Sequence, residues 1–144
     1  MTVPTAPTIT IRVGTFVLRG RLELERAPAT CAAFLRLLPL EGRLLQARWS
    51  GESGWVPLGD LDTSLGAENA TSRPEPGQFL LYPKGVSETE ILVPYGQTVF
   101  ASKFGVLEGN HFLTVTAGRE HLAEIGRRVV WDGAQPITFS REPS

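Results

Sequence analysis

The sequence contains a single cysteine and only two histidines among its 144 residues. Cys31 therefore has no partner within the chain for a disulfide bond. No HxH, HExxH or paired-cysteine motif accompanies His111 or His121, and no glycine-rich phosphate loop is present. We expect neither a bound metal nor a cofactor.

The sequence also lacks an excess of charge of one sign and any long hydrophobic run. Its 14 lysines and arginines are balanced by 15 aspartates and glutamates, which gives a formal net charge of −1. Binding to nucleic acid needs a basic surface, so we expect no nucleic-acid partner. No apolar run approaches a membrane span, and the first residues, MTVPTAPT, do not resemble a secretory signal. We expect a soluble cytoplasmic protein that does not contact membranes.

Short stretches of alternating apolar and polar residues, with 15 glycines and 11 prolines, favour a mainly β protein with many turns. Gly20 indicates a bulge, and Pro57 places its strand at a sheet edge or bulge. We expect one domain over 1–144, with loose termini at 1–7 and 141–144 and a long irregular excursion at 59–77. The predicted strands are 9–13, 16–24, 44–49, 55–58, 79–82, 91–93, 98–102, 110–116, 129–131 and 137–139.

One good helix is predicted at about 28–38. Pro28 suits its first turn, and Pro39 disfavours its continuation. Cys31, Phe34, Leu35 and Leu38 fall at i, i+3, i+4 and i+7 and form one apolar face. Cys31 is thus expected to be a small core residue rather than a nucleophile. A second, short helix is predicted at about 118–125, with Gly126 at its end.

The stretch GQFLLYPKGVSETEILVPYG, residues 77–96, combines two apolar runs with a polar loop, a common setting for a site. Glu88 and Glu90 lie on one side if extended, where they either form a like-charge pair with a raised pKa or lie in an exposed acidic loop. Arg48 suits anion recognition or is solvated. His111 is more often structural than catalytic in such a position. The candidate ligand-binding residues are Arg48, Trp49, Trp55, Tyr82, Glu88, Glu90, Tyr95 and His111.

Several phrases resemble known families. Ala27-Pro28-Ala29-Thr30, Phe34, Leu37 and Arg48 resemble the first third of cyclophilins. The whole chain, from about 9 to 139, is similar to an uncharacterised bacterial cyclophilin-like family, domain-of-unknown-function family 3830. This resemblance implies a closed eight-stranded barrel with helices capping its ends, and no established activity. The phrases that carry it are ARWSGE (47–52), GQFLLYP (77–83), SETEILVPYG (87–96), FASKFG (100–105) and GNHFLTV (109–115).

The cyclophilin resemblance implies a prolyl isomerase site only in part. Arg48 matches the arginine that polarises the prolyl amide, and Trp55 stands for the pocket phenylalanine. Leu58 replaces the glutamine, and residues 89–92 replace the Gln-Phe-Phe strand. We therefore do not expect an efficient prolyl isomerase.

The leading hypothesis is a barrel that binds a small molecule or short peptide in an aromatic and polar pocket. The alternatives are a prolyl isomerase or another uncharacterised enzyme, and a structural or assembly module. We also expect a homodimer, because one small barrel cannot enclose three tryptophans and seven phenylalanines. The Pro57 strand and Trp55 are its candidate interface. In the alternative monomer, the helices and the 59–77 excursion cover that surface.

Overall fold

The computed structural model describes residues 7–142, and in these residues eight antiparallel strands form a closed barrel. The barrel is closed, as the family resemblance implied, because the two strands at the ends of the strand order given next also pair with each other. The order is β2 (Phe16–Leu22), β1 (Thr8–Val13), β11 (Gln135–Arg141), β3 (Leu40–Gln46), β4 (Gly51–Gly59), β7 (Thr89–Thr98), β6 (Gln78–Tyr82), β10 (Gly109–Ala117) and back to β2.

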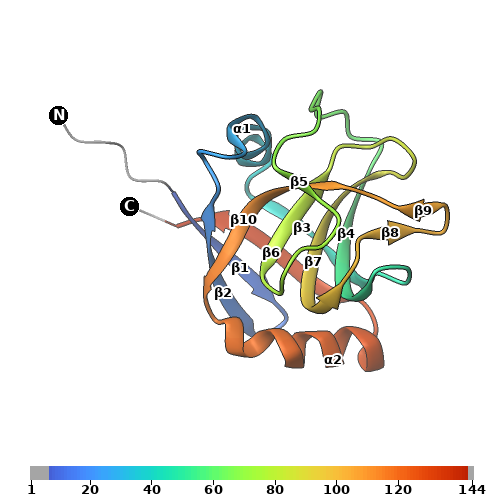
Figure 1. Ribbon diagram of the computed structural model, residues 1–144. Helices are drawn as coiled ribbons and strands as arrows, with labels where there is room; N and C mark the ends of the chain where they lie inside the picture. The colour runs from blue at the N-terminus through green and yellow to red at the C-terminus, as the bar shows by residue number, and fades with distance from the viewer. Residues whose placement is uncertain (1–6, 143–144) are drawn as a thin grey trace.

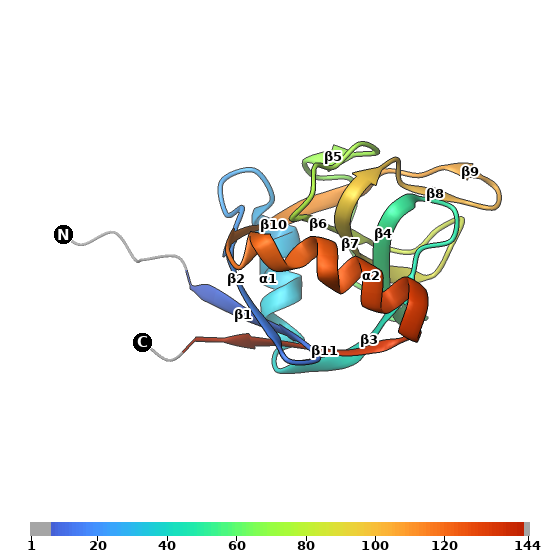
Figure 2. The same ribbon diagram turned by 90° about the horizontal axis from the view of Figure 1, so that it is seen from below.

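Smaller elements surround this barrel. Strand β5 (Ala70–Thr71) pairs with β10, and β8 (Ala101–Ser102) pairs with β9 (Gly105–Val106) in a separate ribbon. Helix α1 (Pro28–Arg36) and helix α2 (Leu122–Asp132) cover opposite ends of the barrel (Figure 1; Figure 2). A 3-10 turn, η1 (Arg119–His121), leads into α2. None of the described helices is both long enough and apolar enough to cross a membrane.

The β2–β10 pair that closes the barrel depends on Gly20. A Cβ at Gly20 would lie 2.6 Å from Leu113 Cδ2, so a larger residue there would require the Leu113 side chain to move. The β10 register shifts between Val115 and Ala117, opposite Gly20 and Arg19. The bulge expected near Gly20 is therefore present, but β10 contains it.

Helix α1 packs its predicted apolar face on one end of the core. The Phe34 ring lies 4.8 Å from the Phe112 ring and 5.6 Å from the Phe139 ring, centroid to centroid. The Cys31 thiol donates to the Phe112 carbonyl oxygen at 3.4 Å, and burial raises its pKa to about 11. A thiol with this pKa is protonated at neutral pH, as expected of a core residue. The helix ends at Arg36, two residues earlier than predicted.

The prediction of a strand at 129–131 is wrong, because these residues belong to α2. Val129, Val130 and Trp131 favour strands locally, but Leu122, Ile125 and Val129 repeat with the helical period and are buried together. The predicted helix at 118–125 thus began too early and ended too soon. Gly126 does not end it. A Cβ at Gly126 would lie 2.2 Å from the Tyr95 ring, so this glycine permits close packing of α2 on β7.

Several strand boundaries also differ from the prediction. Strand β3 begins at Leu40, residues 48–50 form the turn, and Gly51–Gly54 belong to β4 rather than to a turn. The expected strand at 98–102 is broken, with Thr98 ending β7 and Ala101–Ser102 forming β8, and β9 lies where no strand was predicted. Arg141 ends β11, and Glu142 accepts hydrogen bonds from Thr10 and Arg19, so these two residues are not loose. Residues 1–6 and 143–144 lie outside the described part.

The 59–77 excursion has little regular structure, as predicted, and buried polar groups hold it in place. Asn110, 1% exposed, donates to Thr30 Oγ1 at 3.1 Å and to the Gly66 carbonyl at 2.9 Å. Glu68 accepts hydrogen bonds from the Thr30 N–H and hydroxyl, both at 2.8 Å. Burial would raise the Glu68 pKa, but these bonds outweigh it and lower the pKa. Glu68 thus caps the N-terminus of α1.

We predict that Phe34→Ala destabilises the protein by about 3–5 kcal/mol, because it leaves a cavity between α1 and the barrel. Denaturant unfolding measures this change. Phe104→Ala is the control, since the Phe104 side chain is 71% exposed and should contribute little. Equal midpoints for Phe34→Ala and the unsubstituted protein would show that α1 does not belong to the cooperative core.

Candidate functional site

Strand β7 is buried on both faces, and its outer face forms the floor of a pocket. Ile91 and Val93 join the core inside the barrel, whereas Leu92 points outward. Leu80 on β6 and Trp55 on β4 lie directly opposite Leu92 and share its face. They pack with the outer cluster, which comprises Ala47, Leu80, Tyr82, Leu92, Phe100 and Leu107. The chain from Phe100 to Leu107 therefore covers part of the outside of the barrel.

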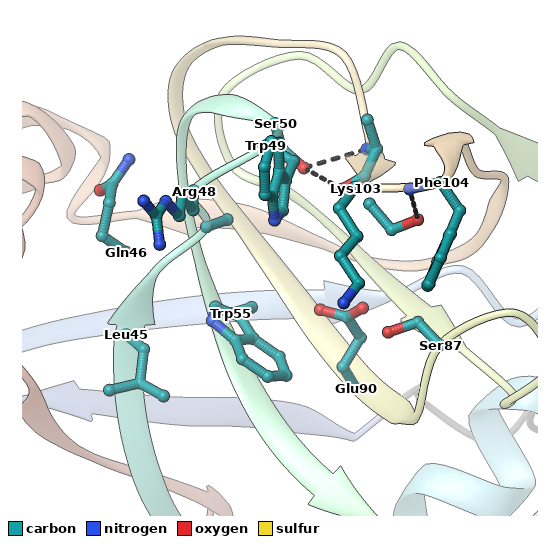
Figure 3. Close-up of a pocket in the computed structure, with 13 residues that line it drawn as sticks. Leu45, Gln46, Arg48, Trp49, Ser50, Trp55, Ser87, Glu90, Lys103 and Phe104 are labelled. Carbon is teal, nitrogen blue, oxygen red and sulfur yellow. Dashed lines mark hydrogen bonds between the residues drawn. The ribbon is translucent and has the colours of Figure 1, made fainter.

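A pocket of about 430 Å³ lies next to the outer cluster. Trp55 and Glu90 come from the barrel strands, and Ser87 comes from the β6–β7 loop (Figure 3). Two loops form the remaining walls. Residues 45–50 belong to the end of β3 and the β3–β4 turn, and residues 101–104 belong to β8 and the β8–β9 turn. This volume is in the range of small-molecule sites.

Ser50 joins the two loop walls. Its hydroxyl donates to the Ala101 carbonyl at 3.1 Å and accepts from the Ala101 N–H at 3.0 Å (Figure 3). Its carbonyl accepts from the Val99 N–H at 3.1 Å, and the residue is 4% exposed. On the other wall, Ser102 Oγ accepts from the Phe104 N–H at 3.1 Å. The pocket walls are therefore held by hydrogen bonds rather than by packing alone.

Glu90 provides a buried carboxyl group on the pocket floor. It lies on β7 between Tyr82 of β6 and Pro57 of β4, and it is 6% exposed. Burial, followed by the nearby charge of Glu88, raises its pKa to about 7. Within residues 7–142 the Glu90 carboxyl makes no hydrogen bond or ion pair, and it points into the pocket (Figure 3). Both protonation states are thus accessible at neutral pH, which suits binding or proton transfer.

Two cations and two aromatic rings come from the loop walls. The Arg48 guanidinium carbon lies 5.7 Å from the Trp49 ring centroid, and Lys103 Nζ lies 5.0 Å from the Phe104 ring centroid. Trp49 is 55% exposed and Phe104 is 71% exposed, so these pairs lie toward solvent. Lys103 extends its amine toward the side of the pocket that holds Glu90 (Figure 3). The pocket therefore combines a buried acid with exposed bases and apolar walls.

Four of the eight candidate residues line this pocket: Arg48, Trp49, Trp55 and Glu90. Arg48 and Trp49 lie in the β3–β4 turn rather than on the predicted strand, because β3 ends at Gln46. Pro57 was predicted to lie at a sheet edge or at a bulge. It lies at a register shift of β4, which agrees with the bulge. Strand β4 is paired on both sides at Trp55, so Trp55 is not on a sheet edge.

The other four candidates lie outside the pocket lining. Tyr82 packs edge-on against Phe100, and its hydroxyl accepts from the Val86 N–H at 2.9 Å. Tyr95 lies toward the other end of β7, where its hydroxyl donates to Gln46 Oε1 at 2.6 Å. Glu88 is half-buried and acts on Glu90 through its charge.

His111 lies on β10, with Nε2 2.8 Å from Thr114 Oγ1, and burial lowers its pKa. One ring nitrogen of this histidine therefore has its partner within its own strand. In residues 7–142, no group of three or more His, Cys, Asp or Glu side chains is arranged to hold a metal ion.

Sequence reasoning missed Ser50, Ser87, Lys103 and Phe104. The sequence did contain a signal for these residues, because the segments ARWSGE and FASKFG are both among those that resemble the family. These two phrases contribute the facing walls of the pocket. Their contact joins positions about fifty residues apart in the chain, so neither phrase alone indicated it.

The fold and this pocket define a closed antiparallel β-barrel protein with a loop-walled cavity on its outer face. The DUF3830 family, described as "Protein of unknown function", matches residues 9–141. The chain belongs to this family. No curated protein matches it.

Two solved structures have the same fold. One is described as "Structure of McbB in complex with tryptophan", with 16% identity and a TM-score of 0.70. The match covers 94% of this chain but only 45% of that one, so this chain spans less than half the length of McbB. The other is the solution structure of the hypothetical protein AF2241 from Archaeoglobus fulgidus, with 15% identity, a TM-score of 0.64 and 95% of each chain covered. Neither is named as a cyclophilin, and the resemblance to that family stays a prediction.

We predict that Glu90 makes stability fall as pH rises. Its folded-state pKa of about 7 lies above the ordinary glutamate value of about 4.3, so the native state binds the proton more tightly than the unfolded state. The resulting stabilisation is complete below about pH 4 and is lost as pH rises through about 7. Relative to Glu90→Gln, the free energy of unfolding should drop by roughly 3 kcal/mol over this interval.

Urea unfolding at closely spaced pH values measures this difference. Glu25→Gln is the control, because Glu25 is exposed and its replacement should leave the pH dependence of the unsubstituted protein. Parallel curves for Glu90→Gln and the unsubstituted protein would contradict the assignment of a raised pKa.

Proposed function

We propose that this protein binds a small organic molecule or short peptide in the pocket between β4, β7 and the two loop walls. The buried Glu90 carboxyl carries this proposal. A carboxyl on an apolar floor costs stability, and such groups are concentrated at functional sites. Trp55 offers an aromatic surface beside it, and Arg48 and Lys103 add polar contacts. Apolar walls with a few placed polar groups are the usual composition of ligand sites.

The described complex of McbB with tryptophan provides a further reason to test aromatic ligands. At 16% identity the likeness concerns the fold, so it selects compounds for testing and assigns none.

An enzyme that uses Glu90 as a general acid or base is the second candidate function. Its support is the Glu90 pKa of about 7, because proton transfer is most effective when the pKa lies near the working pH. Efficient prolyl isomerisation is not part of this proposal. Leu58 stands where the cyclophilin resemblance requires a glutamine.

We predict that the unsubstituted protein carries a ligand through purification or binds one from a screen, and that Trp55→Ala no longer binds it. Native mass spectrometry of freshly purified protein, followed by a screen of small aromatic compounds, measures this binding. Trp131→Ala is the matched control, because Trp131 lies on α2 and is 81% exposed. We expect this control to bind like the unsubstituted protein. Absence of any co-purified or screened ligand that depends on Trp55 would reject the function.

We also propose that the protein forms a homodimer, but through a different surface from the one first expected. Trp55 lines the pocket and is paired on both sides, and beyond it the Pro57 part of β4 pairs with β7 alone and exposes no large hydrophobic side chain. Val130 and Trp131, 52% and 81% exposed, form an apolar surface at the end of α2. Two copies of this surface can cover each other around a two-fold axis, the commonest symmetry of soluble oligomers. An assembly role for the protein would use the same surface.

Trp131→Ser should shift the dimer toward monomer. Sedimentation at micromolar concentration distinguishes a dimer from the 15.7 kDa monomer. Trp49→Ser is the control, because Trp49 is also exposed but lies at the pocket. If the unsubstituted protein sediments as a single monomeric species, the dimer proposal fails.

A further inference from the structure

Resting on the proposed pocket, we propose that its ligand is a small zwitterion with an apolar side group. Its protonated amine would pair with Glu90 on the floor, its acid group with Arg48 and Lys103, and its side group with Trp55. The argument depends on where each charge lies in the pocket.

Glu90 determines the position of the amine. Its carboxyl is 6% exposed, is aimed into the pocket and has no hydrogen-bond or ion-pair partner within residues 7–142. A buried carboxylate is costly unless a donor or cation pairs with it. A ligand ammonium supplies both the charge and three N–H donors. A second carboxylate in the same place would be repelled, as Glu88 already repels Glu90.

Arg48 and Lys103 determine the position of the acid group. They come from two separate loops that Ser50 joins, and both residues are exposed. The acid group of the ligand would therefore lie toward the mouth of the pocket and the amine toward the floor. Charge-assisted hydrogen bonds from a guanidinium or ammonium are among the stronger polar contacts.

Trp55 determines the position of the apolar part. It shares the outer face of the barrel with Glu90, because it lies opposite Leu92, two residues along β7. It is half-buried, so part of its surface is available to a ligand. An aromatic group of the ligand would stack on this ring, which lines the same pocket as Glu90, Arg48 and Lys103.

The charged and titratable groups that face Glu90 are few. Glu88 precedes it in the chain, Tyr82 lies opposite on β6, and Lys103 and Arg48 come from the loops. The opposite residue on β4 is Pro57, which has no charge. The Tyr82 hydroxyl bonds to the Val86 N–H rather than to Glu90. Binding of an ammonium therefore requires Glu90 to release its own proton.

Calorimetric titration with three matched probes tests this inference: L-phenylalanine, phenethylamine and 3-phenylpropionate. We expect L-phenylalanine to bind most tightly and 3-phenylpropionate to bind more weakly than phenethylamine. Raising the pH from 6 to 8 should strengthen phenethylamine binding about tenfold, because Glu90 must ionise while the amine stays protonated. Glu90→Gln should remove this pH dependence and weaken both amines at least tenfold. Lys103→Gln should weaken L-phenylalanine and 3-phenylpropionate but not phenethylamine.

Glu25→Gln is the control and should bind all three probes like the unsubstituted protein. Equal affinity for phenethylamine and 3-phenylpropionate, or an amine affinity unchanged in Glu90→Gln, would overturn the inference. So would failure of all three probes to bind. If a co-purified or screened ligand still depends on Trp55 in that case, the proposed function survives and only the zwitterion is rejected. If no ligand depends on Trp55, both fail.

Discussion

Closure of the barrel between β2 and β10 is the constraint on which the rest of the structure depends. Eight strands close only if these two pair, and Gly20 leaves space for the Leu113 side chain between them. Once the barrel is closed, each strand has one face inside and one outside. The inner faces are filled by the core, and α1 and α2 cover the two ends. The pocket lined by Glu90 and Trp55 lies on the outside, where loops cover the strands.

The outer face of β7 fulfils this condition because the chain after Thr98 folds back over it. Phe100 and Leu107 pack on Leu80 and Leu92, and β7 is buried on both faces from Thr89 to Pro94. Glu90 is in the same row as Leu92, so it is buried although it points away from the barrel core. The Ser50–Ala101 hydrogen bonds hold the two loop walls together at this position. The fold of the chain after Thr98 thus both buries the Glu90 carboxyl and shapes the pocket.

The sequence predicted the parts of this arrangement that local patterns determine. Alternation identified strands β1 and β2, and the helical period identified the buried face of α1 with Cys31 and Phe34. Residues 129–131 were misassigned because a β-branched pair and a tryptophan favour a strand locally, while packing against the barrel favours α2. In the site, Glu90 and Trp55 were found from residue type. Ser50 and Lys103 were not, because their role depends on a contact between distant loops.

The cost of the buried acid links stability to function. An isoleucine or leucine at position 90 would suit the outer cluster better than a carboxyl whose pKa is raised to about 7 by burial. Asn110 and Glu68 are buried or half-buried and make several hydrogen bonds, whereas Glu23 Oε2 and Thr63 Oγ1 are buried without one. Glu90 has none within the described residues, and it faces a cavity with cations at its walls. Any hydrogen bond of the Glu90 carboxyl must therefore be made inside the pocket, either to water or to a bound molecule, and this requirement supports the proposal of a ligand.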